Sequence, residues 1–201
     1  MTATTAPDLR PAEQPRAGAL SPRALGVLLL VTGLVGEAAA FVLTVEKFLL
    51  LTNPFYAPSC SVNARVNCGS VMTSPQAELF GFPNSLLGVA GFAVLAATGS
   101  ALLAAGHLAG WYWTGLQVGV TAGMVFVHWL LIQSVFVIGA LCPYCMVVWV
   151  VTITAFWYAT LHNLTRRRPA AAGFAVRNHS VLLASWFLVL ACVVVGSLWL
   201  A

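Results

Sequence analysis

Charged side chains are scarce in this chain of 201 residues: only 7% are Asp, Glu, Lys or Arg, whereas 60% of the residues are hydrophobic. A water-soluble globular domain of this size does not have such a composition, so a soluble enzyme is excluded. The nine cations flank apolar runs and form no basic face with interleaved aromatic residues, which excludes nucleic acid and leaves the lipid bilayer as a partner. Any catalysis must therefore take place on a bundle of membrane helices.

Motifs for nucleotides, metals and haem are also lacking. A zinc site is not indicated, because no second CxxC pair or histidine pair accompanies residues 142–145. A c-type haem motif fails because Met146, not His, follows Cys145. His128 and His162 fall at different heights in the membrane, so they do not match as a haem ligand pair. We expect neither a metal nor haem.

Five apolar runs are long enough to cross a bilayer, for which about 20 residues suffice. They predict an all-α membrane protein whose spans occupy residues 24–45, 85–105, 111–138, 142–162 and 180–200. Residues 1–22 hold four prolines and no periodic apolar pattern, so we expect a disordered tail there. We divide the chain into this tail, a four-helix core at 23–162 with a polar loop at 46–83, and a basic linker with a fifth transmembrane helix at 163–201.

Lys and Arg residues gather on one side of the predicted spans. Seven of them precede the first span or lie between the fourth and the fifth, whereas only Lys47 and Arg65 fall on the other side. By the positive-inside rule, the tail and the basic linker are cytoplasmic, and the loop, the junction before Cys142 and the C-terminus are extracytoplasmic. Both cysteine pairs then lie on the oxidising side of the membrane, where disulfides persist.

Cys142 and Cys145 form a CxxC pair at the start of the fourth span. Residues three apart on a helix are close to disulfide reach, so such a pair can open and close with little backbone movement. Pro143 favours the first helical position, which places Cys142 at the N-cap, where the helix dipole favours a thiolate. The sequence thus favours a redox-active pair over a structural one.

Cys60 and Cys68 lie eight positions apart in the loop and could simply staple it. On the same face as the CxxC pair, however, they can form a relay in which each disulfide is reduced by the preceding dithiol. Electrons then enter at the exposed loop and leave at the membrane. Because no metal or nucleotide motif supplies an acceptor, a lipid-soluble quinone in the bundle is the economical choice.

The combined pattern resembles the bacterial form of the vitamin K epoxide reductase family over residues 24–162. The resemblance rests on Cys60 to Cys68, on the segments GSVMTS at 69–74 and FPNSLLG at 82–88, and on the CPYC motif at 142–145. It implies a four-helix bundle that encloses a quinone near the outer face. It also implies that Cys60 meets a partner protein, that Cys68 passes electrons to Cys142, and that Cys145 faces the quinone.

The same resemblance implies quinone contacts for three further residues. Ser74 would lie beside the quinone, although a Ser before Pro75 is also a natural N-cap for a short surface helix. Asn84 would bind a quinone carbonyl or merely cap the second span. Trp149 stands where vertebrate members have a Tyr, on the same helix face as the CxxC pair, but its indole N–H is aimed differently.

Three features inside the spans carry weaker predictions. Glu37 is an ionisable group about 12 Å from the outer end of the first span at 1.5 Å per residue. It could transfer protons to a reduced quinone or, protonated, bond a neighbouring helix. Cys192, in the fifth span, behaves as a small apolar residue. Gly115, Gly119 and Gly123 repeat every four residues and predict close approach of a neighbouring helix.

These observations predict a multi-pass disulfide-generating enzyme of the bacterial inner membrane. It would reoxidise a periplasmic thioredoxin-fold protein of the DsbA type and reduce menaquinone or ubiquinone at the extracytoplasmic face. Because the chain stops at Ala201, we expect that partner to be a separate protein. The alternatives are a vitamin K epoxide or quinone reductase of another pathway, and a membrane scaffold whose disulfides are structural.

Overall fold

The computed structural model describes residues 19–53 and 55–200, so most of the predicted tail at 1–22 lies outside the described residues. Five helices of the described chain are long and apolar enough to cross a membrane, which confirms the predicted fold class. The helices are α1 (Pro22–Thr52), α2 (Cys68–Met72), a short 3-10 helix η1 (Pro75–Glu78), α3 (Ser85–Ala105), α4 (Gly110–Ile132), a π-helical turn η2 (Gln133–Ile138), α5 (Pro143–Arg167), α6 (Pro169–Arg177) and α7 (His179–Leu200).

Local signals in the sequence fix the helix ends. Ser21 caps α1 by accepting a hydrogen bond from the Ala24 N–H at 3.2 Å, and Gly106 ends α3 in the left-handed region at φ 72°, which glycine adopts without strain. The end of α1 differs from the prediction, because the helix continues past Val45 to Thr52. Glu46 and Lys47 therefore belong to a helix and not to the loop.

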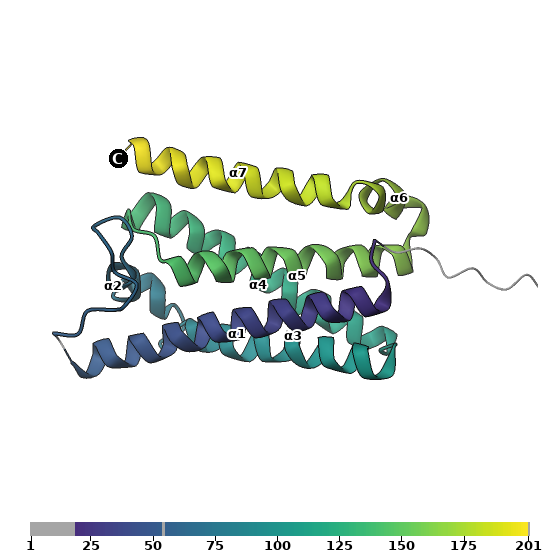
Figure 1. Ribbon diagram of the computed structural model, residues 1–201, viewed down its shortest axis with the longest axis horizontal. Coiled ribbons are helices and arrows are strands. Elements are labelled where there is room, and N and C mark those ends of the chain that lie inside the picture. The colour runs from purple at the N-terminus through teal and green to yellow at the C-terminus, as the bar shows by residue number, and fades with distance from the viewer. Residues whose placement is uncertain (1–18, 54, 201) are drawn as a thin grey trace, which may run out of the picture.

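The long helices pack as a four-helix bundle with one accessory helix (Figure 1). α1 packs along α3 and α5, and α4 packs on α5. α7 lies along the outside of this bundle. Only 6% of its apolar stretch is buried, whereas 44% of the apolar stretch of α1 is buried. Cys192, on α7, is exposed.

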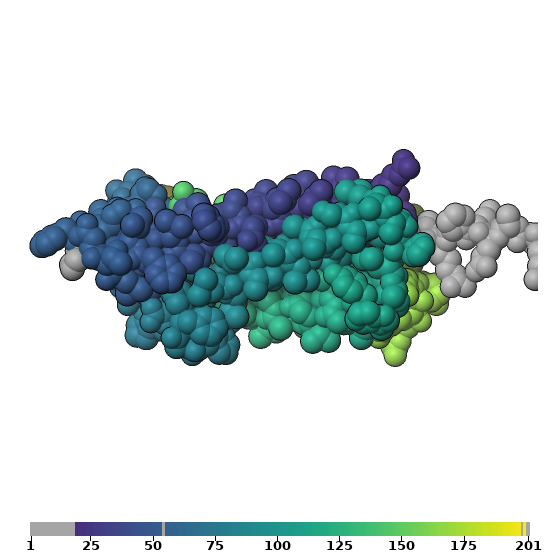
Figure 2. Space-filling model, turned by 90° about the horizontal axis from the view of Figure 1, so that it is seen from below, coloured from purple at the N-terminus to yellow at the C-terminus, as the bar shows by residue number. Residues whose placement is uncertain are grey.

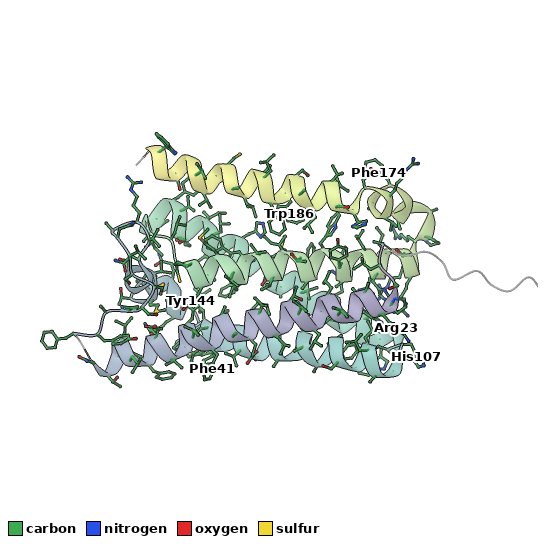
Figure 3. All side chains as sticks on the ribbon, viewed as in Figure 1. Arg23, Phe41, His107, Tyr144, Phe174 and Trp186 are labelled. Carbon is green, nitrogen blue, oxygen red and sulfur yellow. A yellow bond between two sulfur atoms is a disulfide. The ribbon has the colours of Figure 1, made fainter. Side chains whose placement is uncertain are left out.

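The two ends of the bundle carry different residues (Figure 3). Arg23, His107 and Phe174 lie at one end, and Tyr144 lies toward the other. We call the second end the cysteine end, because it carries the loop with α2 and the start of α5. α1 begins at the opposite end, near Arg23, and α7 returns toward the cysteine end.

Glycines allow α1 and α3 to approach closely. A Cβ atom added to Gly33 would lie 2.4 Å from the backbone nitrogen of Ala96, and one added to Gly99 would lie 2.3 Å from that of Leu30. The space-filling view shows the surfaces of α1 and α3 in direct contact along this face (Figure 2). This contact therefore depends on the absence of side chains at both glycines.

The predicted glycine contact on α4 is wrong for two of its three positions. A Cβ atom added to Gly115 or Gly119 would have no neighbour within 4 Å, and one added to Gly123 would meet only the Thr152 side chain at 3.6 Å. These glycines line a cavity between α3 and α4 instead. A spacing of four fixes the helix face on which residues lie but not what that face contacts.

We predict that Gly99→Ala destabilises the protein by about 1–3 kcal/mol, because the added methyl group must push α1 and α3 apart. Gly115→Ala is the matched control and should leave the melting temperature in detergent unchanged or slightly raised, since alanine favours helix. Thermal unfolding of both variants measures the difference. Equal melting temperatures for the two variants would contradict the close contact between α1 and α3.

Candidate active site

The loop cysteines form a disulfide at the start of α2. Cys60 and Cys68 are bonded, with their Cα atoms 5.7 Å apart. Asn67 caps the short helix by accepting a hydrogen bond from the Ser70 N–H at 3.1 Å, which fixes the direction in which Cys68 enters it. The disulfide is not on an exposed part of the loop as expected, because Cys60 is 7% exposed and Cys68 is fully buried. A protein partner must therefore displace part of the loop to reach it.

A backbone bridge docks the loop onto the residue before the CxxC pair. Val66 and Leu141 form an isolated parallel β-bridge. The Leu141 N–H donates to the Arg65 carbonyl at 2.7 Å, and the Asn67 N–H donates to the Leu141 carbonyl at 3.0 Å. The residues that immediately precede Cys68 and Cys142 are thus tied to each other, although 74 positions separate the two cysteines.

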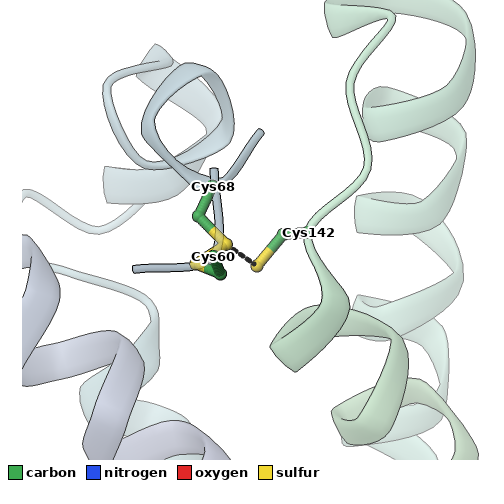
Figure 4. A group of neighbouring side chains, drawn as sticks. All are labelled: Cys60, Cys68 and Cys142. Carbon is green, nitrogen blue, oxygen red and sulfur yellow. Dashed lines mark hydrogen bonds between the residues drawn. A yellow bond between two sulfur atoms is a disulfide. The ribbon is translucent and has the colours of Figure 1, made fainter. Parts of the chain in front are cut away.

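The bridge brings the two cysteine pairs into contact (Figure 4). The Sγ atoms of Cys68 and Cys142 are 3.1 Å apart, and the Sγ atoms of Cys60, Cys68 and Cys142 all lie within 4.8 Å of one another. Cys142 is a buried free thiol at the N-cap of α5, ahead of Pro143. A thiol in contact with a disulfide sulfur is arranged for thiol–disulfide exchange.

The same three sulfurs could also hold a metal ion if the loop disulfide were reduced. In the disulfide, Cys60 and Cys68 have no thiolate to offer as a ligand. A structural zinc site further needs four ligands. In the oxidation state that the structure shows, the cluster fits exchange chemistry and not metal binding.

The environment of Cys142 stabilises its thiolate. The pKa of Cys142 lies below its ordinary value because the Cys145 side chain donates a hydrogen bond to it, and the backbone N–H groups of Cys145 and Tyr144 add to the effect. Burial and the negative charge of Glu46 oppose this lowering. The thiolate is the nucleophile in exchange, so a lowered pKa keeps Cys142 reactive at lower pH.

A cavity of about 550 Å³, partly open at the surface, lies between α1, α3, α4 and α5. α3 and α4 contribute more residues to its wall than any other elements, and Cys145 and Trp149 of α5 line it as well. It extends from Ser74 and Asn84 at the cysteine end to Trp111 and Tyr112 near the start of α4. The volume and the largely apolar wall are typical of a site for a small organic molecule.

The polar residues predicted for this site lie at its rim, but neither caps a helix with its side chain. The Ser74 hydroxyl donates to the Val71 carbonyl at 2.7 Å. The Asn84 side chain donates to the Gln76 carbonyl at 2.6 Å and accepts from the Leu79 N–H at 3.2 Å. Asn84 therefore ties the start of α3 to η1, and its second amide hydrogen remains for a ligand.

Of the predicted residues Trp149 and Glu37, only Trp149 lines the cavity. Trp149 is buried and lines the cavity with Cys145. Glu37 is not among the lining residues, and its buried Oε2 atom has no hydrogen-bond partner within the described chain. The geometry therefore gives no support to Glu37 as a proton donor in the cavity or as a bond to a neighbouring helix through this atom.

Sequence reasoning missed Gln133 and Lys47, which also line the cavity. The Gln133 side-chain oxygen lies 3.4 Å from the Gln76 side-chain nitrogen, so the two amides meet across the rim. A polar residue at the end of the third apolar run was the available signal for Gln133. No local signal marks Lys47, because its placement depends on the extension of α1 beyond the apolar run.

Comparison with known proteins gives one family. Residues 27–160 match the sequence profile described as "Vitamin K epoxide reductase family". The comparison with individually curated proteins gave no match. The matched segment contains Cys60, Cys68, Cys142 and Cys145 and the wall of the cavity.

We predict that the Cys142 thiolate, followed by its ultraviolet absorbance, forms with a midpoint below the ordinary thiol pKa of about 8.5. The titration uses a Cys145→Ser/Cys192→Ala variant with the loop disulfide intact, because the serine hydroxyl still donates to Cys142. A Cys145→Ala/Cys192→Ala variant loses that donor, and its midpoint should lie higher. The thiolate disappears as the pH falls through each midpoint. Equal midpoints at or above the ordinary value would contradict the assigned cause.

Proposed function

The chain belongs to the vitamin K epoxide reductase family, and from this premise we propose that it is a thiol:quinone oxidoreductase that generates disulfides. Its substrate on the thiol side would be a thioredoxin-fold oxidant of the DsbA type, and its acceptor would be a membrane quinone. The observation that carries the proposal is the 3.1 Å contact between Cys68 and Cys142 Sγ atoms, with Cys145 on the wall of the cavity.

The proposed cycle begins with the partner dithiol. A partner thiolate attacks Cys60, forms a mixed disulfide and releases the Cys68 thiolate. The second partner thiolate resolves this mixed disulfide, so the partner leaves oxidised and both loop cysteines are reduced. The loop must open for this step, because Cys60 is buried in the closed arrangement.

Transfer to the CxxC pair follows. The Cys68 thiolate attacks Cys142 of a Cys142–Cys145 disulfide, and Cys145 leaves as a thiolate. Cys60 then attacks Cys68, which restores the loop disulfide and releases Cys142. The structure corresponds to the state after this step, since the loop pair is bonded and Cys142 and Cys145 are free thiols.

The last step regenerates the CxxC disulfide. Cys142 and Cys145 together give two electrons and two protons to the quinone, which becomes a quinol, and a Cys142–Cys145 disulfide forms. The net reaction converts partner dithiol and quinone to partner disulfide and quinol. No other oxidant is required.

The shape of the cavity supports a quinone that bears a long apolar substituent. A ring at the cysteine end would lie near Cys145, Trp149 and the second amide hydrogen of Asn84. The wall continues along Gly115 and Gly119 toward the other end of α4, where an added side chain would meet open space. Ser74 at the rim is a second polar group for the ring.

We further propose that the cysteine end faces the extracytoplasmic side of a bacterial inner membrane. Arg23, at the opposite end, begins α1 with its cationic neighbours Arg10 and Arg16 upstream in the sequence, whereas the loop carries only Arg65. The positive-inside rule then places the α1 start in the cytoplasm and the cysteines in the oxidising compartment.

We predict that Cys142→Ala and Cys145→Ala abolish quinone reduction by any thiol. Cys60→Ala and Cys68→Ala should block oxidation of a reduced DsbA-type protein but retain some activity with dithiothreitol, because a small dithiol can reach the CxxC pair directly. Loss of quinone absorbance in detergent, with a short-chain ubiquinone as acceptor, measures both reactions.

Cys192→Ala is the matched control, because this cysteine is exposed on α7 and forms no disulfide, and the turnover of this variant should equal that of the wild type. Equal loss in all four cluster variants with dithiothreitol would show that the loop pair does more than relay electrons. A wild-type protein that leaves quinone unreduced would identify a scaffold with structural disulfides instead.

A further inference from the structure

Two adjacent charged residues are buried near the end of α1. Glu46 is 6% exposed and Lys47 is 7% exposed. Burial of an ionised side chain is unfavourable unless hydrogen bonds or an opposite charge compensate it. Neither residue exchanges sulfur or electrons with the cysteines, so their partners show what this burial achieves.

Glu46 binds the part of the loop that leads to Cys60. The Tyr56 hydroxyl donates to Glu46 Oε2 at 2.8 Å, and the Ser59 hydroxyl donates to Oε1 at 2.6 Å. The Ser59 backbone N–H also donates to Oε1 at 3.4 Å. Ser59 directly precedes Cys60, so the carboxylate fixes the backbone next to the reactive disulfide.

Lys47 binds the part of the loop that follows Cys68. Its ammonium group donates to the Met72 carbonyl at 2.7 Å, at the end of α2, and pairs with Glu78 Oε1 at 2.8 Å, at the end of η1. Ser74, Gln76 and Ala77 lie between these two contacts, and all three line the cavity. Lys47 therefore holds the segment that closes the cysteine end of the cavity.

Helix geometry keeps the two sets of contacts separate. Consecutive residues on an α-helix project about 100° apart. Glu46 and Lys47 can therefore reach segments on different sides of α1, and within the described part of the chain they share no hydrogen-bond or ion-pair partner. One short stretch of α1 fixes both halves of the loop independently.

We propose that Glu46 and Lys47 are positioning residues that divide the loop into two separately anchored halves: a relay half at 56–60, held by Glu46, and a lid half at 72–79, held by Lys47. This assignment rests on the proposed function for its kinetic consequences. Glu46 controls the reaction of Cys60 with the partner, whereas Lys47 controls how the cavity holds the quinone.

Amide hydrogen exchange tests the two halves without any assay of activity. Glu46→Gln and Lys47→Gln are matched, since each replaces a buried charge by the same neutral side chain. We expect Glu46→Gln to speed exchange at 56–60 and Lys47→Gln at 72–79, each by at least about tenfold, the effect of losing one charge-assisted hydrogen bond. The other segment should stay unchanged in each variant.

Glu78→Gln is a second, milder variant for the lid half, because the Glu78 side chain is 40% exposed and its replacement is less disturbing to folding. It should speed exchange at 72–79 only, and by less than Lys47→Gln, since the bond from Lys47 to Met72 remains. Faster exchange in both segments of every variant, or unchanged exchange in all of them, would overturn the proposal.

Kinetics then link the halves to the reaction. With dithiothreitol and a short-chain ubiquinone, Lys47→Gln should raise the KM for quinone by roughly tenfold with kcat unchanged. Glu46→Gln should keep that KM and slow only the oxidation of a reduced DsbA-type protein. If both variants changed the KM for quinone and the rate of DsbA-type protein oxidation to the same extent, the result would contradict separate roles. If the wild type reduces no quinone, the proposed function fails, while hydrogen exchange still decides whether two anchored halves exist.

Discussion

The chemistry of this protein depends on one short backbone pairing. Residues 65–67 of the loop bond to Leu141 through two hydrogen bonds of 2.7 and 3.0 Å. This pairing places the loop disulfide next to the start of α5, where Cys142 is the N-cap residue. Without it, the loop pair and the CxxC pair would be two unrelated cysteine motifs on one face of a membrane. With it, the Cys68 and Cys142 Sγ atoms are 3.1 Å apart, and electron transfer between the pairs needs only exchange of sulfur partners.

A second constraint separates the packed side of the bundle from the open side. Gly33 and Gly99 allow α1 and α3 to touch along their backbones. α3 and α4 instead both line the cavity, and the glycines of α4 place no side chains in it. Glycine thus allows close packing between α1 and α3 and leaves room for the cavity between α3 and α4. Cys145 lies on the wall of that space, so the proposed thiol relay and the cavity meet at one side chain.

The sequence predicted those features that depend on local signals. Apolar runs identified the five spans, and Pro143 identified the start of α5 with Cys142 at its N-cap. The end of α1 was missed because Glu46 and Lys47 were interpreted as loop residues. Their hydrogen-bond partners, which only the folded chain brings near, explain how a helix can bury both charges. The burial of Cys60 and the contact of Cys68 with Cys142 could not be predicted from composition, since both depend on a pairing between segments that lie far apart in the chain. Family resemblance named the cysteines and paired Cys68 with Cys142, but the arrangement of the loop around them is a property of the folded chain.

The most direct test of the account is to trap the sulfur pair that it places in contact. In a Cys60→Ser/Cys145→Ser/Cys192→Ala variant, Cys68 and Cys142 are the remaining cysteines, and mild oxidation with diamide should join them rapidly, as peptide mass spectrometry would show. A Cys68→Ser/Cys142→Ser/Cys192→Ala variant retains Cys60 and Cys145 and should form its disulfide far more slowly. A folded first variant whose thiols stay free, or that couples no faster than the second, would contradict direct transfer between Cys68 and Cys142.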